Sequence, residues 1–260
     1  MKPFEFLEKM DEKKENMIEI KEISRFEGNS IILGLPDVGL VGSIASAHLI
    51  DQLKLKEIAE INSDIFPPIV VVHKHRPMSP IRIYANNEIG VVISEVPISP
   101  DMINPLMESL TEWFKSNKLE LVISIGGIPH PNRLEIDKPK VYGVSTSKRL
   151  DGVLRKNKIE MFEDGLIVGP SGIMLKKCME KGINAVYLMA ESHYKYPDPG
   201  AAASIINAIS KILKMKIDVK LLLEKAEEIR ITARDLMKRT EDVMKKMEKM
   251  HEKEIPMMYR

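Results

Sequence analysis

The sequence predicts an α/β layer fold with a mostly parallel sheet, followed by one long C-terminal helix. Two observations carry this prediction. Short apolar runs alternate with helical stretches along the first 217 residues, an order of elements that builds a parallel sheet covered by helices. After residue 217 the apolar side chains recur every three or four residues, which is the period of an amphipathic helix. We therefore expect an α/β domain at residues 1–217 and a separate C-terminal segment at residues 218–260.

Five strands and two helices are predicted in the first half of the chain. Met17–Ile23 alternates apolar and charged residues, as a half-buried strand does, whereas Ser30–Leu35 is continuously apolar, as a strand buried on both faces is. One helix is expected at Val41–Gln52, and Asp101 can cap a second helix that runs through Trp113. Turns that contain Pro or Asn separate three further β-rich runs, at Ile69–His75, Ile81–Ala85 and Ile89–Glu95.

The second half of the chain repeats a simpler alternation. A helix is expected at Gly172–Lys181, where Gly182 stops it. Asp198 and Pro199 open a further helix, because Asp is a good N-cap and Pro is favoured at the first helical position. Four strands are predicted here, at Leu121–Ile125, Val141–Val144, Leu166–Val168 and Ala185–Met189.

The C-terminal segment carries a heptad pattern. Its a and d positions are Val219, Leu222, Ala226, Ile229, Ala233, Leu236, Thr240, Val243, Met247 and Met250. Roughly four and a half heptads reach the usual length of a coiled coil. A helix of about 30 residues is about 45 Å long, more than one domain easily covers, so we favour self-association over a helix folded back on its own domain. The predicted oligomerisation residues are Leu222, Ile229, Leu236, Val243 and Met247.

Composition and charge argue against several classes of protein. The 39 Lys and Arg residues balance the 38 Asp and Glu residues, and no segment is a basic lobe, so nucleic acid is not an expected partner. No apolar run approaches the roughly 18 residues of a membrane span. The first 23 residues carry charges throughout, unlike a secretory signal, and the single Cys178 fits a reducing compartment. We expect a cytoplasmic protein that does not bind a membrane.

A glycine-rich turn joins the buried strand to the first helix. Gly34, Gly39 and Gly42 surround a helix N-terminus, where free N–H groups often bind phosphate. The spacing resembles a P-loop, but Leu40 and Val41 stand where Lys and Ser or Thr are required. We therefore favour a tight turn with close helix–strand packing over a phosphate site.

Three other groups of polar residues fit ordinary structural roles. His73 and His75 lie two apart on one strand face and could meet His130, but no cysteine or carboxylate accompanies them at ligand spacing, so no metal is expected. Ser171 resembles the nucleophile of a G-x-S-x-G elbow, but the second glycine comes one residue early, and a helix cap accounts for the serine. Cys178, inside a predicted helix, is expected to be a small core residue.

A polar loop follows the last predicted strand. Glu191, His193 and Asp198 lie there, at the edge of the sheet where α/β proteins commonly bind ligands, and all three side chains can do acid–base work. Polar residues at a strand end are also ordinary loop chemistry. The loop thus predicts a pocket but no reaction.

The last three residues carry a different signal. Met258, Tyr259 and Arg260 follow Pro256, which ends the long helix. They offer an apolar side chain, an aromatic hydroxyl and a terminal carboxylate. A chain terminus inserted into a pocket can use all three, with the carboxylate paired to a lysine.

Four segments of the chain resemble the archaeal proteasome assembly chaperone family. They are GLPDVGLVGSIASAHLI near the start, ISIGGIPHP in the middle, GPSGIMLKKCMEKGINAVYLMAES, and YPDPGAAASIINAISKIL. They occur in the family's order, and the resemblance covers roughly residues 17–225. It implies a three-layer α/β/α sandwich similar to nucleoside phosphorylases, without their known catalytic apparatus.

The resemblance also implies a function without catalysis or a cofactor. Its members help α-type proteasome subunits to assemble or dock on the α-ring, and such factors often end in a hydrophobic residue, Tyr and any residue. Met258, Tyr259 and Arg260 match that pattern position for position. By this carry-over, Tyr259 enters a pocket between adjacent α subunits and the terminal carboxylate meets a lysine there. The implied partners are the α subunits or the core particle, further copies of this chain, and a paralogous chaperone.

Two other hypotheses stay open. The Gly34–Gly42 turn and the Glu191–Asp198 loop could serve a nucleosidase- or phosphorylase-like hydrolase, although the chain lacks a complete catalytic motif. An oligomeric scaffold for another partner is the third. The heptad pattern fixes no oligomer number, and the sequence does not separate an assembly chaperone from an activator of finished proteasomes.

Overall fold

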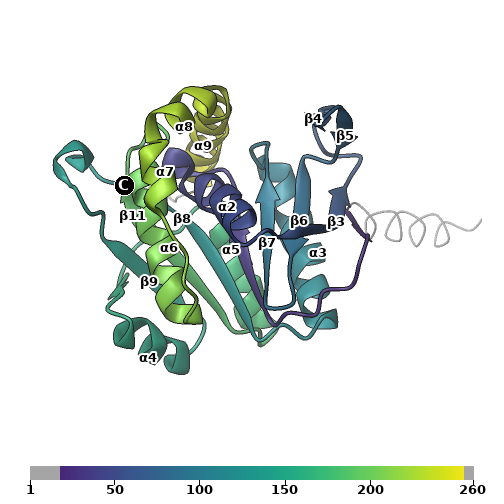
Figure 1. Cartoon of the computed structure of the whole chain (residues 1–260), viewed down its shortest axis with the longest axis horizontal. Coiled ribbons are helices and arrows are strands. Elements are labelled where there is room, and N and C mark those ends of the chain that lie inside the picture. The colour runs from purple at the N-terminus through teal and green to yellow at the C-terminus, as the bar shows by residue number, and fades with distance from the viewer. Residues whose placement is uncertain (1–17, 255–260) are drawn as a thin grey trace, which may run out of the picture.

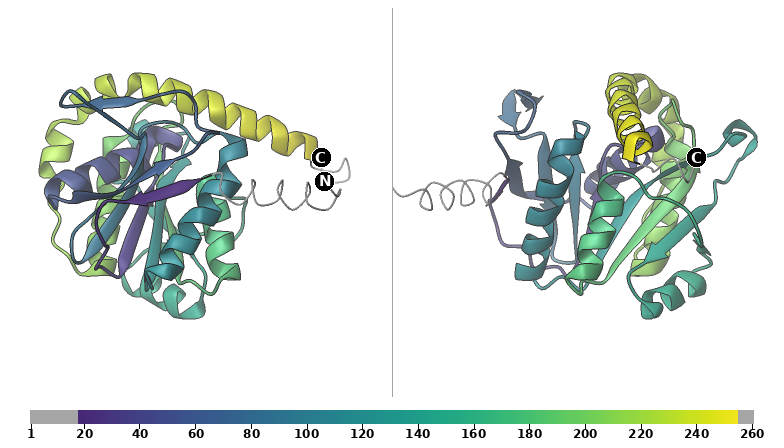
Figure 2. Two further views of the ribbon diagram at one scale, coloured as in Figure 1. Left: turned by 90° about the vertical axis from the view of Figure 1, so that its right-hand side faces the viewer. Right: turned by 180° about the vertical axis from the view of Figure 1, so that it is seen from behind.

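The computed structural model describes residues 18–254, in which a central sheet lies between two layers of helices (Figures 1 and 2). The order of the strands across the sheet differs from their order in the chain, so the connections cross over. From one edge to the other, the strands are β1 (Glu19–Glu22), β3 (Lys56–Asn62), β6 (Ile81–Ala85), β7 (Ile89–Ser94), β2 (Ser30–Gly34), β8 (Leu121–Pro129), β11 (Ala185–Ser192), β9 (Val141–Ser145) and β10 (Glu160–Met161).

The sheet is parallel at its centre, antiparallel pairings lie on both sides of that centre, and the outermost pair at one edge, β9 and β10, is parallel. β7, β2, β8 and β11 run parallel to one another, as the apolar runs predicted. β1, β3, β6 and β7 are joined by antiparallel pairings, and β9 is antiparallel to β11. The short turn between β6 and β7 accounts for part of this, because a short connection can join only antiparallel neighbours. Asn86 stabilises that turn by accepting hydrogen bonds from the N–H groups of Glu88 and Ile89, each at 2.9 Å.

Two helices cover each face of the sheet. α2 (Val41–Gln52) and α6 (Pro199–Leu213) lie on one face, over a buried cluster that includes Leu49 and Ile205. α3 (Pro100–Ser116) and α5 (Pro170–Glu180) lie on the other face, over a second cluster that includes Phe114 and Met174. α4 (Lys148–Lys156) packs beside β9 and β10. The three-layer α/β/α arrangement is therefore observed.

Three details of the predicted elements need correction. Leu166–Val168 is not a strand: it lies in a loop, where Leu166 is 72% exposed. β3 and α4 were not predicted, because their many Lys, Glu and Arg residues hide the periodicity. The N-cap of α3 is Ser99, and Asp101 instead lies in the first turn, where its charge complements the helix dipole.

The C-terminal segment is broken into three helices, so the prediction of one long helix was wrong. They are α7 (Lys220–Glu224), α8 (Ala226–Thr232) and α9 (Arg234–Glu254). Lys225 and Ala233 interrupt the helix with ψ values near zero, outside the α region. These two bends let the segment follow the surface of the α/β domain, as Figure 2 shows.

The heptad stripe packs largely against the protein's own domain. Leu222 is 3% exposed, and it belongs to the core cluster beneath α2 and α6, with Ile229 and Leu236 packed against the same cluster. Met247 packs against the cluster on the opposite face. Val243 is half-buried. A helix folded back on its own domain is thus what the structure shows, and self-association through these residues stays a prediction.

Leucine-to-alanine substitutions test this packing. Leu222→Ala should lower the free energy of unfolding by about 2–5 kcal/mol, because it leaves a cavity in the core. Leu223→Ala is the matched control, since Leu223 is 48% exposed and its loss should cost less than about 0.5 kcal/mol. Urea unfolding of both variants gives the comparison. Equal effects would mean that α7 does not pack on the domain.

Candidate functional site

The carboxyl ends of β2, β8 and β11 meet at one edge of the sheet, where α/β proteins commonly bind ligands. The glycine-rich turn that was singled out in the sequence lies there, between β2 and α2. It contains a short 3-10 helix, η1 (Val38–Leu40), in which Gly39 and Leu40 have φ values of 62° and 50°. The turn is therefore an irregular connection that glycine makes possible at its centre.

The glycines of this junction permit close approach of the backbone. A Cβ atom at Gly34 would lie 1.8 Å from Ser46 Oγ, and one at Gly42 would lie 2.7 Å from the carbonyl oxygen of Leu35. A Cβ atom at Gly127, on β8, would lie 2.4 Å from the carbonyl oxygen of Val38. No side chain fits at any of these positions. The geometry supports the prediction of a tight turn with close helix–strand packing.

A carboxyl group of the protein, that of Asp37, lies at this helix N-terminus, where a phosphate could otherwise bind. Asp37 accepts hydrogen bonds from the N–H of Gly42 at 3.3 Å and from the N–H of Gly127 at 2.7 Å. Burial raises the pKa of Asp37 to about 8, although the hydrogen bonds from both N–H groups lower the pKa. Burial, together with the nearby Asp37, also raises the pKa of Tyr187.

Asp198 is the most highly connected residue of the junction. Its side chain caps α6 by accepting from the N–H of Ala201 at 2.9 Å, which confirms the predicted cap. The same carboxylate accepts from Nε of Arg133 at 2.7 Å and from Nη2 at 2.9 Å. Asp198 also accepts from the N–H of His193, and its own N–H donates to the carbonyl of Gly39 at 2.8 Å. Arg133 and Asp198 are both buried.

Sequence reasoning missed Arg133. It lies in a loop of mixed polar composition, and nothing in its spacing distinguishes it from its neighbours. The predicted cap Asp198 was the only indirect signal. If such an aspartate is fully buried, it requires a cation close by, and that cation is Arg133.

The three predicted acid–base residues do not form one catalytic group. Glu191 is buried and accepts from the N–H of Lys140 at 2.9 Å and from the hydroxyl of Tyr142 at 3.2 Å, so it fastens β11 to the chain before β9. Asp198 is bound to Arg133. Burial lowers the pKa of His193, although Asp198 acts in the opposite direction. The side chains of Glu191 and Asp198 are thus held by different structural partners.

The other candidates of the sequence also have local partners. His73 and His75 do not share a strand face as predicted, because the strand ends at His73 and His75 lies in a turn. His73 Nε2 lies 2.8 Å from Glu95 Oε1, and residues 18–254 contain no group of three side chains placed to hold a metal ion. Burial raises the pKa of Cys178 to about 12, which keeps the thiol protonated. The prediction that Ser171 caps α5 was wrong, because the N-cap is Gly169; Ser171 lies in the first turn, where its side chain interacts with Tyr187.

Within the described part of the chain, no helix is long and apolar enough to span a membrane. The predicted proteasome-binding residues Met258, Tyr259 and Arg260 lie outside the described residues.

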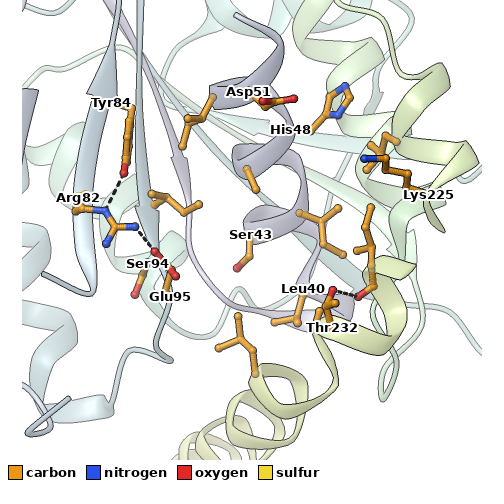
Figure 3. Close-up of a pocket in the computed structure, with 18 of the residues that line it drawn as sticks. Leu40, Ser43, His48, Asp51, Arg82, Tyr84, Ser94, Glu95, Lys225 and Thr232 are labelled. Atoms are coloured by element: carbon orange, nitrogen blue, oxygen red, sulfur yellow. Dashed lines mark hydrogen bonds and ion pairs between the residues drawn. The ribbon is translucent and has the colours of Figure 1, made fainter. Parts of the chain in front are cut away.

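A groove of about 840 Å³ opens beside α2, which we call the α2 groove (Figure 3). One wall is mostly apolar, with some polar side chains, and comes from α2, α7, α8 and the start of α9; the other comes from β6 and β7. Arg82 lies in the second wall, where Nε donates to the Tyr84 hydroxyl at 3.0 Å and the guanidinium pairs with Glu95. Ser43 Oγ, buried in the first wall, has no hydrogen-bond partner among the described residues. Sequence analysis did not single out this groove.

A family model and a relative from another organism both match most of this chain. The model of the PAC2 family matches residues 31–237. An uncharacterised protein of Methanocaldococcus jannaschii is 33% identical over 224 residues, which cover 86% of this chain and 92% of that protein.

Two solved structures of proteins related to the proteasome are similar to this chain. PbaA of Pyrococcus furiosus, an archaeal homolog of proteasome-assembly chaperone, aligns with a TM-score of 0.82 and 28% identity, over 87% of this chain and 99% of its own. PbaB of the same organism, an archaeal proteasome activator, aligns with a TM-score of 0.72 and 25% identity, over 85% of this chain and 98% of its own.

Breaking the buried ion pair tests its role in the junction. Arg133→Ala leaves the Asp198 carboxylate buried without its cation, so the free energy of unfolding should fall by about 3–5 kcal/mol. Lys140→Ala is the control, because it removes an exposed ion pair with Glu160 and should have no measurable effect. Chemical unfolding measures both. A small effect of Arg133→Ala would show that the junction is held by other contacts.

The pH dependence of stability tests the environment of Asp37. Because the pKa is about 8 in the folded protein, compared with an ordinary value of 3.8, the unfolded chain releases this proton at a lower pH. The contribution of Asp37 is therefore fully present below the ordinary value and is lost as the pH rises to about 8.

Asp37→Asn removes this titration, so its free energy of unfolding should fall less than that of the wild type between about pH 5 and pH 8. Asp51→Asn, at an exposed position, is the control. Equal slopes for the wild type and Asp37→Asn would contradict the raised pKa.

Proposed function

The chain belongs to the PAC2 family, and we propose that it acts as a proteasome assembly chaperone or activator rather than as an enzyme. The observation that carries the proposal is the similarity to PbaA, which extends over nearly the full length of that chain with a TM-score of 0.82. The similarity to PbaB, a proteasome activator, points to the same partner. We propose that the protein acts in the cytoplasm.

The C-terminal residues are the proposed docking element. Met258 supplies an apolar side chain, Tyr259 an aromatic ring with a hydroxyl, and Arg260 the terminal carboxylate. In this proposal Tyr259 enters a pocket between adjacent α subunits, and the carboxylate pairs with a lysine there. An oligomer of this chain presents several such tails, and binding of one tail raises the effective concentration of the others. A paralogous chaperone is a further proposed partner.

The arrangement at the strand ends favours a role without catalysis. Asp37 already accepts from the N–H of Gly42 in the glycine-rich turn and from the N–H of Gly127 on β8, and Asp198 and Glu191 are engaged in structural hydrogen bonds. A nucleosidase- or phosphorylase-like reaction would need these groups to face a substrate. Neither the family match nor the described relatives support that alternative.

A pull-down of proteasome subunits tests the proposal. Wild-type protein should capture the α-ring, the core particle or both, and a variant that lacks Met258, Tyr259 and Arg260 should lose most of this capture. Tyr259→Ala should lose at least about tenfold in affinity, because one buried aromatic anchor commonly contributes about 2 kcal/mol or more to an interface. Tyr196→Ala is the matched control, since Tyr196 is an exposed tyrosine of the α/β domain.

The possible outcomes separate the parts of the proposal. Capture by the truncated protein at full strength would keep the partner and place the contact on the α/β domain. Absence of capture by the wild type would reject the proteasome as the partner. Preference for free α subunits over the core particle would identify an assembly chaperone, and the reverse preference an activator.

A further inference from the structure

A short two-stranded ribbon stands out from the body of the protein (Figure 1). It consists of β4 (Val71–His73) and β5 (Arg76–Met78), which form a sheet of their own. Lys74 and His75 make its turn with φ values of 47° and 65°, as a tight hairpin turn requires at both central positions. We call residues 69–78 the β4–β5 ribbon.

The ribbon exposes apolar side chains that the rest of the described chain does not cover. Val70, just before β4, is 64% exposed, and Val72, within β4, is 65% exposed. An isolated ribbon of two strands is only marginally stable in water. The exposed valines are therefore a surface that gains stability when it is covered.

The α2 groove is the surface next to the ribbon, and His73 lines it. On its apolar wall, Ala47 is exposed and Ile50 is half-buried. On its other wall, β6 and β3 continue the sheet, and Figure 1 shows no described helix in front of these two strands. A volume of about 840 Å³ accommodates several apolar side chains of an incoming segment.

The face of the sheet beside the α2 groove is acidic, whereas the turn of the β4–β5 ribbon is basic. Glu57 is paired with Tyr84 and Glu60 with Arg82 across β3 and β6, so both carboxylates lie on the uncovered face of the sheet. Neither lies within ion-pair distance of a cation among the described residues, and Arg82 is already paired with Glu95. The pKa of Glu57 is raised, first by burial and further by Glu60, although Arg82 acts against this.

The cations of the groove do not cancel this negative charge. Lys225, between α7 and α8, lies across the groove from Arg82 and Glu95, and Asp51 on α2 also lines the groove (Figure 3). The turn of the ribbon, in contrast, exposes Lys74 and Arg76, for which no ion pair is found among the described residues. A basic turn that reaches the β3–β6 face would meet Glu57 and Glu60.

We propose that the β4–β5 ribbon of one copy of this chain docks in the α2 groove of a second copy. Val70 and Val72 then lie against the apolar wall, and the basic turn lies against the acidic face of β3 and β6. A second copy is the occupant that the charges and the exposed valines favour, because every copy carries both the ribbon and the groove. The contact pairs two copies or closes a ring, according to the rotation between them. It does not depend on the proteasome as a partner.

Sedimentation velocity of the full-length protein tests this contact. Val72→Asp changes the ribbon and Ala47→Glu changes the groove, and each should weaken self-association by at least about tenfold because it places a charge in an apolar contact. Val168→Asp is the matched control, since Val168 is exposed to a similar extent, 52%, on a different loop. All three positions are exposed, so the variants should unfold at the same temperature as the wild type.

Mixing the two variants identifies the contact as one between copies. The ribbon of Ala47→Glu and the groove of Val72→Asp are both intact, so an equimolar mixture should form a heterodimer that neither variant forms alone. A wild type that stays monomeric at about 100 μM, inside the μM–mM range in which exposed apolar surfaces bring chains together, would overturn the proposal. Unchanged self-association of both variants, compared with the wild type, would also overturn the proposal.

Two further tests distinguish this contact from association through other surfaces. Met250→Asp changes an exposed residue of α9, and dissociation by this variant alone would place the contact on the C-terminal helices instead. A mixture of Val72→Cys with Ala47→Cys should form a disulfide-linked heterodimer under mild oxidation, and Val168→Cys should not link to Ala47→Cys. The native Cys178 is fully buried and does not compete. Failure of the Val72→Cys pair to cross-link in an associating protein would reject the contact.

Discussion

The carboxylate of Asp198 fixes the arrangement on which the strand-end junction depends. It caps α6 through the N–H of Ala201 and binds the guanidinium of Arg133 through both oxygens. Its backbone N–H meanwhile donates to the carbonyl of Gly39, in the turn before α2. One buried residue thus joins the loop after β8, the loop after β11 and the turn after β2. Removing either charge would leave the other buried without a partner, so neither residue can change alone.

This junction determines what the glycine-rich turn can do. With Gly39 held against Ser192 and Asp198, and Gly127 against Val38, the turn is packed too closely to accept a side chain at either position. Asp37 completes the junction by accepting from the two N–H groups that point into it. A helix N-terminus that often binds phosphate in other proteins is therefore occupied by the protein's own carboxyl group. The same sequence pattern that suggests a nucleotide site builds a closed structural element.

Sequence periodicity predicted the elements that have a regular pattern of burial from their first residue to their last. β2 is buried on both faces and forms a continuous apolar run, and α2 begins and ends as expected. β3 was missed because its outer face carries Glu57 and Glu60. The bends at Lys225 and Ala233 were missed because heptad periodicity continues through them. Partners distant in sequence, such as Arg133 and Asp198, leave no local pattern, so they become visible only in three dimensions.

The packing of the C-terminal helices constrains how several tails could act together. Leu222 and Met237 are buried in the protein's own domain, so releasing the stripe for a helical partner would expose apolar area that costs about 2–5 kcal/mol for each large side chain. Copies that associate through a surface of the α/β domain avoid that cost. The end of α9 then keeps a fixed position relative to the domain, and the contact between domains sets the spacing of the chain ends. Rigid spacing that matches the sites on a ring raises the effective concentration of each tail, whereas a mismatch removes the gain entirely.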